Sequence, residues 1–472
     1  MEKQVGNVDT LCTMLGQELA PNVITLLDDI VQRNAVYKVN PALLDSFIVD
    51  IDKQVSAQMD EILHKKEFQE LESAWRGLHH LVQSAKFSRP VRIEMLDISK
   101  DELQADLQAA IEDEGLAKQS GFYHHLYWNA YDKVGGHPYS TIVADYRFDS
   151  SPRDINMLSY LSMIGEDAQI PFIGNTSPQF FGRDNFGQVM NDHYFVEQME
   201  QDDAYTAWRA FRDDDRSKYI GLVLPRFLGR LTYGPDTNST QNFNYTENAT
   251  SEDDYLWCNA SFALAGNMVR SFEEWGWSCK LVGVDSGGRV TGLPLQTYEE
   301  GGRKKVKVPL EASVGKEKDV QLSELGFISL AHWDRTDYGV FFELASTQKP
   351  PVIKDDPQAT GSFSVGARLQ YMMLVTRIAH YLQYRQLSHV GKYEGVGAIE
   401  TDLRKWMDTL VADFPNPSEE VIGKKPLRSY ALEVKESEEK PGFFMLNIEI
   451  RPHVAIVGMD IKLRLVAYHT LE

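Results

Sequence analysis

The strongest constraint on the fold is the pattern of the C-terminal end of the chain. Residues 430–436, 443–450 and 459–466 each alternate apolar and polar side chains. A period of two is typical of a half-buried β-strand. Residues 441–442 and 451–458 have the composition of turns between these segments. The chain is therefore expected to end in an antiparallel meander whose last strand lies at a sheet edge, where unpaired N–H and C=O groups are open to another chain.

The N-terminal part of the chain is dominated by helical periodicity. Residues 43–63 and 67–84 carry apolar side chains at the spacing of amphipathic helices, and residues 24–33 form a shorter pattern of the same kind. Residues 91–96 are predicted to be a strand. Residues 99–102, Ser-Lys-Asp-Glu, form a capping box that predicts the start of another helix. A strand followed by a capped helix indicates an α/β beginning.

The rest of the chain mixes both periods, and its polar stretch at 233–254 predicts a long surface loop. We predict the α+β class: a multi-layer mixed αβ body with a C-terminal antiparallel β meander and an N-terminal helical arm. The expected domains are an arm over 1–42, a discontinuous core over 43–115 and 360–472, and an inserted α/β outer domain over 116–359. Further strands are expected over 141–145, 171–175 and 218–224, and further helices over 154–164, 366–386 and 397–412.

The charge and composition of the chain exclude some classes of binding partner. The formal net charge of -21 argues against nucleic acid, because phosphate binding needs clustered Lys and Arg. The basic cluster at 303–307 is interpreted as the solvated edge of a hairpin, with a docking patch as the alternative. No apolar run reaches the roughly 18–20 residues of a membrane-spanning helix, and the N-terminus has no signal-peptide pattern, so we expect no direct membrane insertion. The three cysteines form no CxxC pair, which favours a reduced cytoplasm.

Motifs for catalysis and ligand binding are missing or incomplete. Gly315-Lys316 lacks the other residues of a phosphate-binding loop, and residues 286–288 are interpreted as a tight turn. The adjacent histidine pairs point apart on a helix, and the acidic runs lack the spacing of a calcium loop. We therefore expect no cofactor, no metal and no enzymatic activity. The alternative is a hydrolase that uses a carboxylate pair such as Asp213 and Asp215.

A resemblance begins at residues 68–78, Phe-Gln-Glu-Leu-Glu-Ser-Ala-Trp-Arg-Gly-Leu. This motif resembles the large subunit of the type VI secretion contractile sheath. Short matches continue in order from about residue 43 to the end of the chain, which makes the resemblance specific although no match indicates chemistry. The further matches lie at 56–64, 100–103, 225–228, 243–248, 255–257, 286–288, 348–350, 371–373, 377–381, 426–428 and 451–453.

The resemblance implies a mode of assembly. The chain would pair with a small sheath subunit, and these pairs would stack with further copies as helical rings around an inner tube protein. Terminal strands of neighbouring subunits would join in one sheet. The sheath would start from a baseplate and contract to drive the tube through a target membrane, and an AAA+ unfoldase would later dismantle it. The alternative within the same family is a non-contractile tail or baseplate scaffold.

Three sets of candidate residues follow from the resemblance. Residues 24–33 resemble the unfoldase-recognition helix, the alternative being a helix packed on its own domain. The short connection from Arg33 to Pro41 departs from the longer linker that is common in the family. The polar side of the helix at 397–412 is the candidate contact with the inner tube. The sets are Leu26, Leu27, Asp28, Asp29, Ile30 and Val31 for the unfoldase; Leu446, Ile448, Ile450, Ile461, Leu463 and Leu465 for strand sharing; and Glu400, Asp402, Arg404 and Lys405 for the tube.

Overall fold

The computed structural model divides the chain into two compact units. The smaller unit contains residues 1–68 and 232–255, and the larger contains residues 69–231 and 256–472. The residues that the structure describes are 41–132, 136–235, 237–238, 240, 243–300, 303–333, 336–354, 356–387, 396–436, 444–453 and 463–468.

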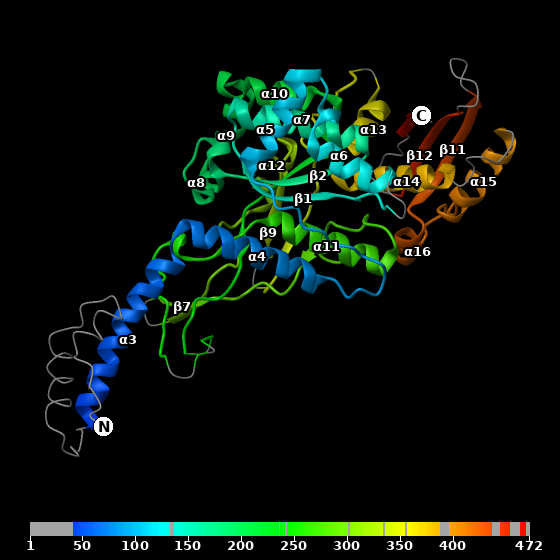
Figure 1. Cartoon of the computed structure of the whole chain (residues 1–472). Coiled ribbons are helices and arrows are strands. Elements are labelled where there is room, and N and C mark those ends of the chain that lie inside the picture. Colours follow the sequence, from blue (N-terminus) through cyan, green and yellow to red (C-terminus); the bar gives the residue numbers. More distant parts are fainter. Residues whose placement is uncertain are drawn as a thin grey trace, which may run out of the picture. The chain divides into compact units, whose positions relative to one another are not determined.

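A mixed six-stranded sheet forms the centre of the larger unit, with the strand order β1-β2-β3-β9-β10-β6 (Figure 1). The first four of these strands are parallel, and the last two are antiparallel to their neighbours. Strands β2 and β3 are buried along their whole length, which explains why the sequence of β3 is a short continuous apolar run. The strands are β1 (Ile142–Phe148), β2 (Phe172–Thr176), β3 (Ile220–Leu224), β9 (Ile328–His332), β10 (Gly339–Phe341) and β6 (Arg289–Val290).

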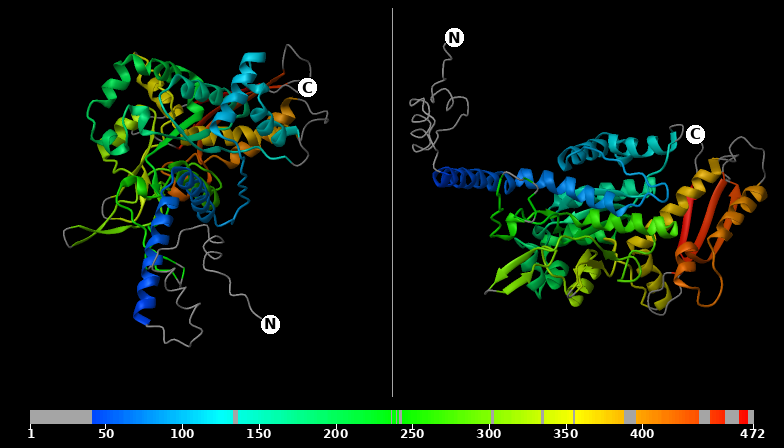
Figure 2. Two further views of the ribbon diagram at one scale, coloured as in Figure 1. Left: turned by 60° about the vertical axis from the view of Figure 1, so that its left-hand side comes forward. Right: turned by 90° about the horizontal axis from the view of Figure 1, so that it is seen from below.

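Helices cover both faces of this sheet. Successive residues of a strand point to opposite faces, so Leu222 and Leu224 of β3 belong to one apolar cluster and Val223 to another. The first cluster includes residues of α5 (Lys100–Glu114), α6 (Gly121–Tyr127), α7 (Pro152–Ala168), α10 (Thr206–Asp213) and α12 (Lys316–Glu324). The second includes residues of α4 (Lys66–Ser84), α11 (Ala260–Trp275) and α14 (Leu369–Leu387). Figure 1 and Figure 2 show α4, in blue, and α11, in green, running side by side.

The helix ends follow from local sequence. Ser99 and Glu102 form the predicted capping box at the start of α5, and Gly115 ends that helix in the left-handed conformation. Ser151 caps α7 and is followed by Pro152 in the first turn, where a missing N–H costs nothing. The remaining helices and strands are α8 (Phe186–Asn191), α9 (Phe195–Gln201), α13 (Pro357–Gly366), α16 (Glu419–Lys424), β4 (Phe227–Leu228), β5 (Trp257–Cys258), β7 (Thr297–Glu300) and β8 (Arg303–Val306).

The C-terminal part of the larger unit is the predicted meander. Strands β11 (Leu427–Glu436), β12 (Phe444–Pro452) and β13 (Leu463–Tyr468) form a three-stranded antiparallel sheet in that order. The inner face of β11 and β12 packs on α14 and α15 (Val396–Thr409) in a third apolar cluster. Figure 1 shows β11 and β12 beside α14 and α15.

The smaller unit joins α3 (Pro41–Leu63) to the loop that was predicted at 233–254. The Asp60 carboxylate accepts hydrogen bonds from the Tyr245 hydroxyl at 2.6 Å and from the Asn248 amide at 3.3 Å. His64 Nε2 lies 3.3 Å from Glu247 Oε1. These contacts tie the loop to the end of α3, so that the loop has a structural role within the smaller unit.

Two local predictions differ from the structure. Residues 91–96 form no strand, because no strand within the described residues pairs with them. The expected strand at 218–224 begins only at Ile220, since residues Asp215–Tyr219 form a 3-10 turn. The basic cluster lies on β8, which pairs with β7 as an antiparallel hairpin, as expected.

Candidate assembly interface

The outer edge of β13 is open within the part of the chain that the structure describes. One side of β13 pairs with β12 over six residue pairs, from Met445↔Tyr468 to Ile450↔Leu463. No strand among the described residues pairs with its other side, as the sequence predicted. Such an edge presents a row of backbone donors and acceptors that another strand can complete.

The side chains of β12 anchor this sheet to the body of the larger unit. Leu446, Ile448 and Ile450 are 2%, 1% and 2% exposed, in the same apolar cluster as Leu403 and Met407 of α15. Strand β12 is central and is paired on both sides. These three residues therefore hold the sheet in place, while the open backbone belongs to β13.

The residues proposed for strand sharing lie on two neighbouring strands, β12 and β13, except for one that the structure does not describe. The register pairs Leu465 with Ile448 and Leu463 with Ile450, so the two predicted sets occupy matching positions on neighbouring strands. Ile461 lies outside the described residues. The opposite face of the sheet is polar, with exposed Glu433 and Lys435 linked by a 3.0 Å ion pair.

Some of the polar side chains of α15 form ion pairs and hydrogen bonds that hold this helix in position. Arg404 pairs with Glu400 and donates a hydrogen bond to the Leu432 carbonyl on β11. Asp402 lies 3.4 Å from Arg385 of α14. Arg404 and Lys405 are both exposed. Of the four residues proposed to contact an inner tube, Glu400, Asp402 and Arg404 take part in the contacts just described, and Arg404 and Lys405 are the two that are exposed.

A tyrosine that the sequence analysis did not single out completes the junction between α15 and the sheet. The Tyr430 hydroxyl donates to Asp408 Oδ1 at 2.7 Å and lies 3.1 Å from the Arg404 carbonyl. Burial and the hydrogen bond to Asp408 raise the pKa of Tyr430 to about 12. The alternation that predicted β11 placed Tyr430 at its start, but only the fold shows its partner.

Comparisons with known proteins identify the family of this chain. Residues 45–348 match the family described as "EvpB/VC_A0108, tail sheath N-terminal domain", and residues 358–468 match "EvpB/VC_A0108, tail sheath gpW/gp25-like domain". The chain belongs to the VipB/EvpB tail sheath family. It is 35% identical over 429 residues to the type VI secretion system sheath protein TssC1 of Pseudomonas aeruginosa, covering 90% of this chain and 85% of that protein. The chain is therefore a structural type VI secretion sheath protein, as its sequence motifs indicated.

Two solved structures from the anti-feeding prophage align with most of this chain at low sequence identity. The baseplate structure aligns with a TM-score of 0.40 and 10% identity, covering 84% of this chain and 77% of that chain. The contracted helical sheath aligns with a TM-score of 0.38 and 10% identity, covering 85% and 81%.

The predicted unfoldase-recognition helix lies outside the described residues of this sheath protein. Residues 26–31 precede α3, which is the first element that the structure describes. The set of Leu26, Leu27, Asp28, Asp29, Ile30 and Val31 therefore stays a prediction. No helix among the described residues has the length and apolar character needed to cross a membrane.

Two carboxylates of the acidic run that suggested a hydrolase, Asp214 and Asp215, are held in ion pairs. Asp214 pairs with Arg216, and Asp215 pairs with Lys218 and accepts from Gln348 Nε2 at 2.9 Å. Among the described residues, no group of three or more His, Cys, Asp or Glu side chains is placed to hold a metal ion. Asp214 and Asp215 therefore stabilise the turn before β3.

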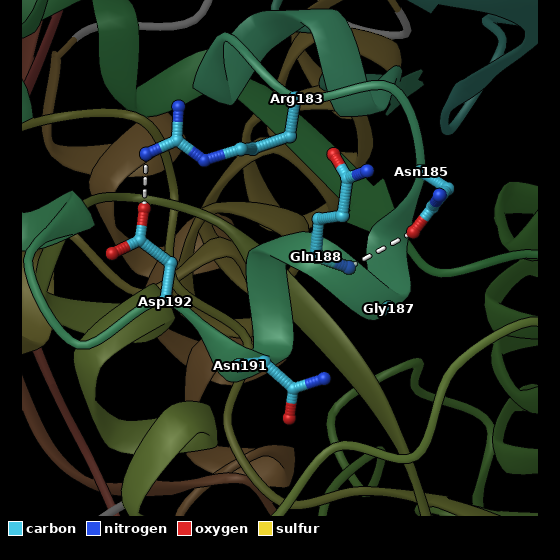
Figure 3. A pocket seen from close by; sticks show the side chains of 6 residues that line it. All are labelled: Arg183, Asn185, Gly187, Gln188, Asn191 and Asp192. Atoms are coloured by element: carbon cyan, nitrogen blue, oxygen red, sulfur yellow. Dashed lines mark hydrogen bonds and ion pairs between the residues drawn. The ribbon is translucent and has the colours of Figure 1, made fainter.

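A surface hollow is lined by polar residues of the α8 region (Figure 3). Arg183 and Asp192 form an ion pair across it, and the Asn185 side chain caps α8 by accepting from the Gln188 amide. The hollow is wide open, and the side chains of Arg183, Asp192 and Asn185 are already engaged in these bonds. This arrangement stabilises the local fold and offers no enclosed ligand site.

Proposed function

We propose that this chain is the large subunit of a contractile sheath that assembles with a small sheath subunit and further copies of itself around an inner tube. The open edge of β13 carries this proposal. A strand from a neighbouring subunit would extend the β11-β12-β13 sheet through backbone hydrogen bonds. The buried side chains of β12 would transmit load from that shared sheet to the body of the larger unit.

Strand sharing suits a lattice that changes shape. Backbone pairing fixes two strands to each other without requiring a particular side-chain interface. Bodies that remain joined by shared strands can then rotate between an extended and a contracted arrangement. The energy for movement would be stored in the extended lattice, so this chain would need neither cofactor nor catalytic activity.

Further contacts complete the proposed cycle in the cytoplasm. A baseplate would start assembly, and the exposed side of α15 around Lys405 would face the inner tube. An AAA+ unfoldase would recognise the segment at 26–31 and dismantle the contracted sheath. We also propose the domain division expected from the sequence, with residues 116–359 inserted into a discontinuous core.

Electron microscopy of the chain co-expressed with a small sheath subunit tests the proposal. Hollow, regularly striated tubules are the expected result. A monodisperse heterodimer that never forms tubules would instead favour the non-contractile scaffold of the same family. A chain that binds no small subunit would contradict the proposal.

A further inference from the structure

A buried cation at the end of α10 has no carboxylate partner. Arg212 is 4% exposed, and its Nε and Nη2 atoms donate to main-chain carbonyls, those of Thr347 at 3.1 Å and Glu324 at 2.7 Å. Within the part of the chain that the structure describes, Arg212 forms no ion pair, and its Nη1 atom forms no hydrogen bond. Burial lowers the pKa of Arg212 to about 10, so the group still carries its charge at neutral pH. Because a buried charge is costly unless it is paired, this arrangement predicts a bound anion.

The same guanidinium lines a partly enclosed pocket of about 200 Å³. The pocket is formed by residues of α9 and α10 and of the segments that follow α12 and β10, all within the larger unit. Trp208 and Leu325, which are 1% and 2% exposed, form part of its wall. Pockets for drug-sized molecules have volumes of roughly 300–1,000 Å³, so this one suits a smaller ligand.

The charged side chains of the pocket favour an oxyanion that keeps a proton. Arg209 and Lys349 line it together with Arg212. Arg209 donates to two main-chain carbonyls and one hydroxyl, and Lys349 forms no ion pair among the described residues. The exposed Glu200 and Asp213 also line the pocket, and neither pairs with these cations. Phosphate retains a proton at neutral pH, so it can accept hydrogen bonds from the cations and donate one to a carboxylate, whereas sulfate can only accept.

We propose that this pocket is a binding site for a small protonated oxyanion of the inorganic phosphate class. The bound anion compensates the charge of Arg212 and accepts the hydrogen bond that its Nη1 atom does not make within the protein. It thereby stabilises the junction at which Arg212 joins α10 to the end of α12 and to Thr347. No strand of the β11-β12-β13 sheet lines the pocket, so the site does not depend on the proposed assembly.

Thermal denaturation of the full chain in chloride buffer, with inorganic phosphate added stepwise, tests the proposal. The melting temperature is expected to rise with phosphate and then to level off, because a ligand that binds the folded state stabilises it by mass action. Sulfate at the same ionic strength is the comparison, since both anions also stabilise proteins in general by exclusion from their surface. An equal rise with sulfate, or no rise with phosphate, would overturn the proposal.

The variant Lys349→Gln locates the site without disturbing the fold. Arg212 also holds two main-chain carbonyls, so the exposed Lys349 is the residue to substitute. Isothermal titration calorimetry should show phosphate affinity at least about tenfold weaker, because a charge-assisted hydrogen bond is lost. The melting temperature in chloride alone should stay the same. Lys425→Gln removes an exposed lysine after α16 and should leave phosphate affinity unchanged. Equal phosphate affinity of Lys349→Gln and the unsubstituted chain would rule out this site.

Discussion

At the scale of single residues, close packing between α4 and α11 leaves room for no side chain at Gly77. A Cβ added there would lie 2.3 Å from Cδ2 of Phe262. We expect Gly77→Ala to lower the free energy of unfolding by about 1–3 kcal/mol, the usual cost of overpacking. Urea denaturation followed by circular dichroism measures this change.

A second glycine provides the matched control. A Cβ added at Gly397 in α15 meets no atom within 4 Å, so Gly397→Ala should leave stability equal or slightly higher. A destabilisation of the same size in both variants would show that helical glycines act through the backbone here, and the packing argument at Gly77 would fail.

Buried histidines predict loss of stability in acid. Burial lowers the pKa of His380 to about 4, and burial with the nearby Arg270 lowers the pKa of His80 to about 4. The unfolded chain, with an ordinary pKa near 6.5, binds these protons first. The stabilising contribution is therefore complete above about pH 6.5 and declines as the pH falls toward 4. His380→Gln should flatten the decline of melting temperature between pH 7 and 4.5.

Asp145 acts in the opposite direction and serves as the comparison. Burial raises the pKa of Asp145 to about 6, so the folded chain binds this proton first, and its stability gains as the pH falls. Asp145→Asn should therefore steepen the acid decline that His380→Gln flattens. Identical slopes in both variants and the parent chain would contradict this assignment.

Residue roles were predictable only where the signal was local. The capping box of Ser99 and Glu102 was predicted because both partners lie within one turn of helix. The positive φ of Phe87 was not predicted, because a backbone angle cannot be inferred from amino-acid composition. Glu273, which accepts hydrogen bonds from the amides beside Phe87, is also remote in the sequence. Leu446, Ile448 and Ile450 were correctly placed on a strand, but their burial against α15 depends on tertiary packing.

At the scale of elements, β13 is predicted to be dispensable for folding and required for assembly. Deleting residues 459–472 removes this strand and leaves the β11–β12 pair on α14 and α15. The truncated chain should remain folded by circular dichroism but form no tubules with the small subunit. Deleting residues 469–472 alone retains β13 and should preserve the tubules. Normal tubules from the longer deletion would contradict strand sharing.

Elements were predicted well where periodicity and pairing agreed. The meander, α7 and the buried parallel strands follow their sequence patterns because each buries the apolar face that its pattern marks. The helices α3 and α4 also form as predicted, although apolar residues of their stripes such as Ile51, Leu71 and Trp75 are exposed. Residues 91–96 have the same alternation but no partner strand among the described residues. Alternation is a property of one segment, whereas a strand also needs a second segment to pair with. The sequence alone therefore could not distinguish residues 91–96 from the segments that do pair in a sheet.

At the scale of the whole molecule, assembly and disassembly should depend on different segments. The shared-sheet elements lie at the C-terminal end, whereas the apolar face of Leu27 and Ile30 lies before α3. The double variant Leu27→Ala with Ile30→Ala should therefore form tubules normally but be captured at least several-fold less by the AAA+ unfoldase. Pull-down of contracted sheaths measures the capture, with Gln32→Ala as the polar control. Capture equal to that of the unsubstituted chain would remove these residues from the recognition site and leave the assembly mechanism unaffected, because no strand of the shared sheet is altered.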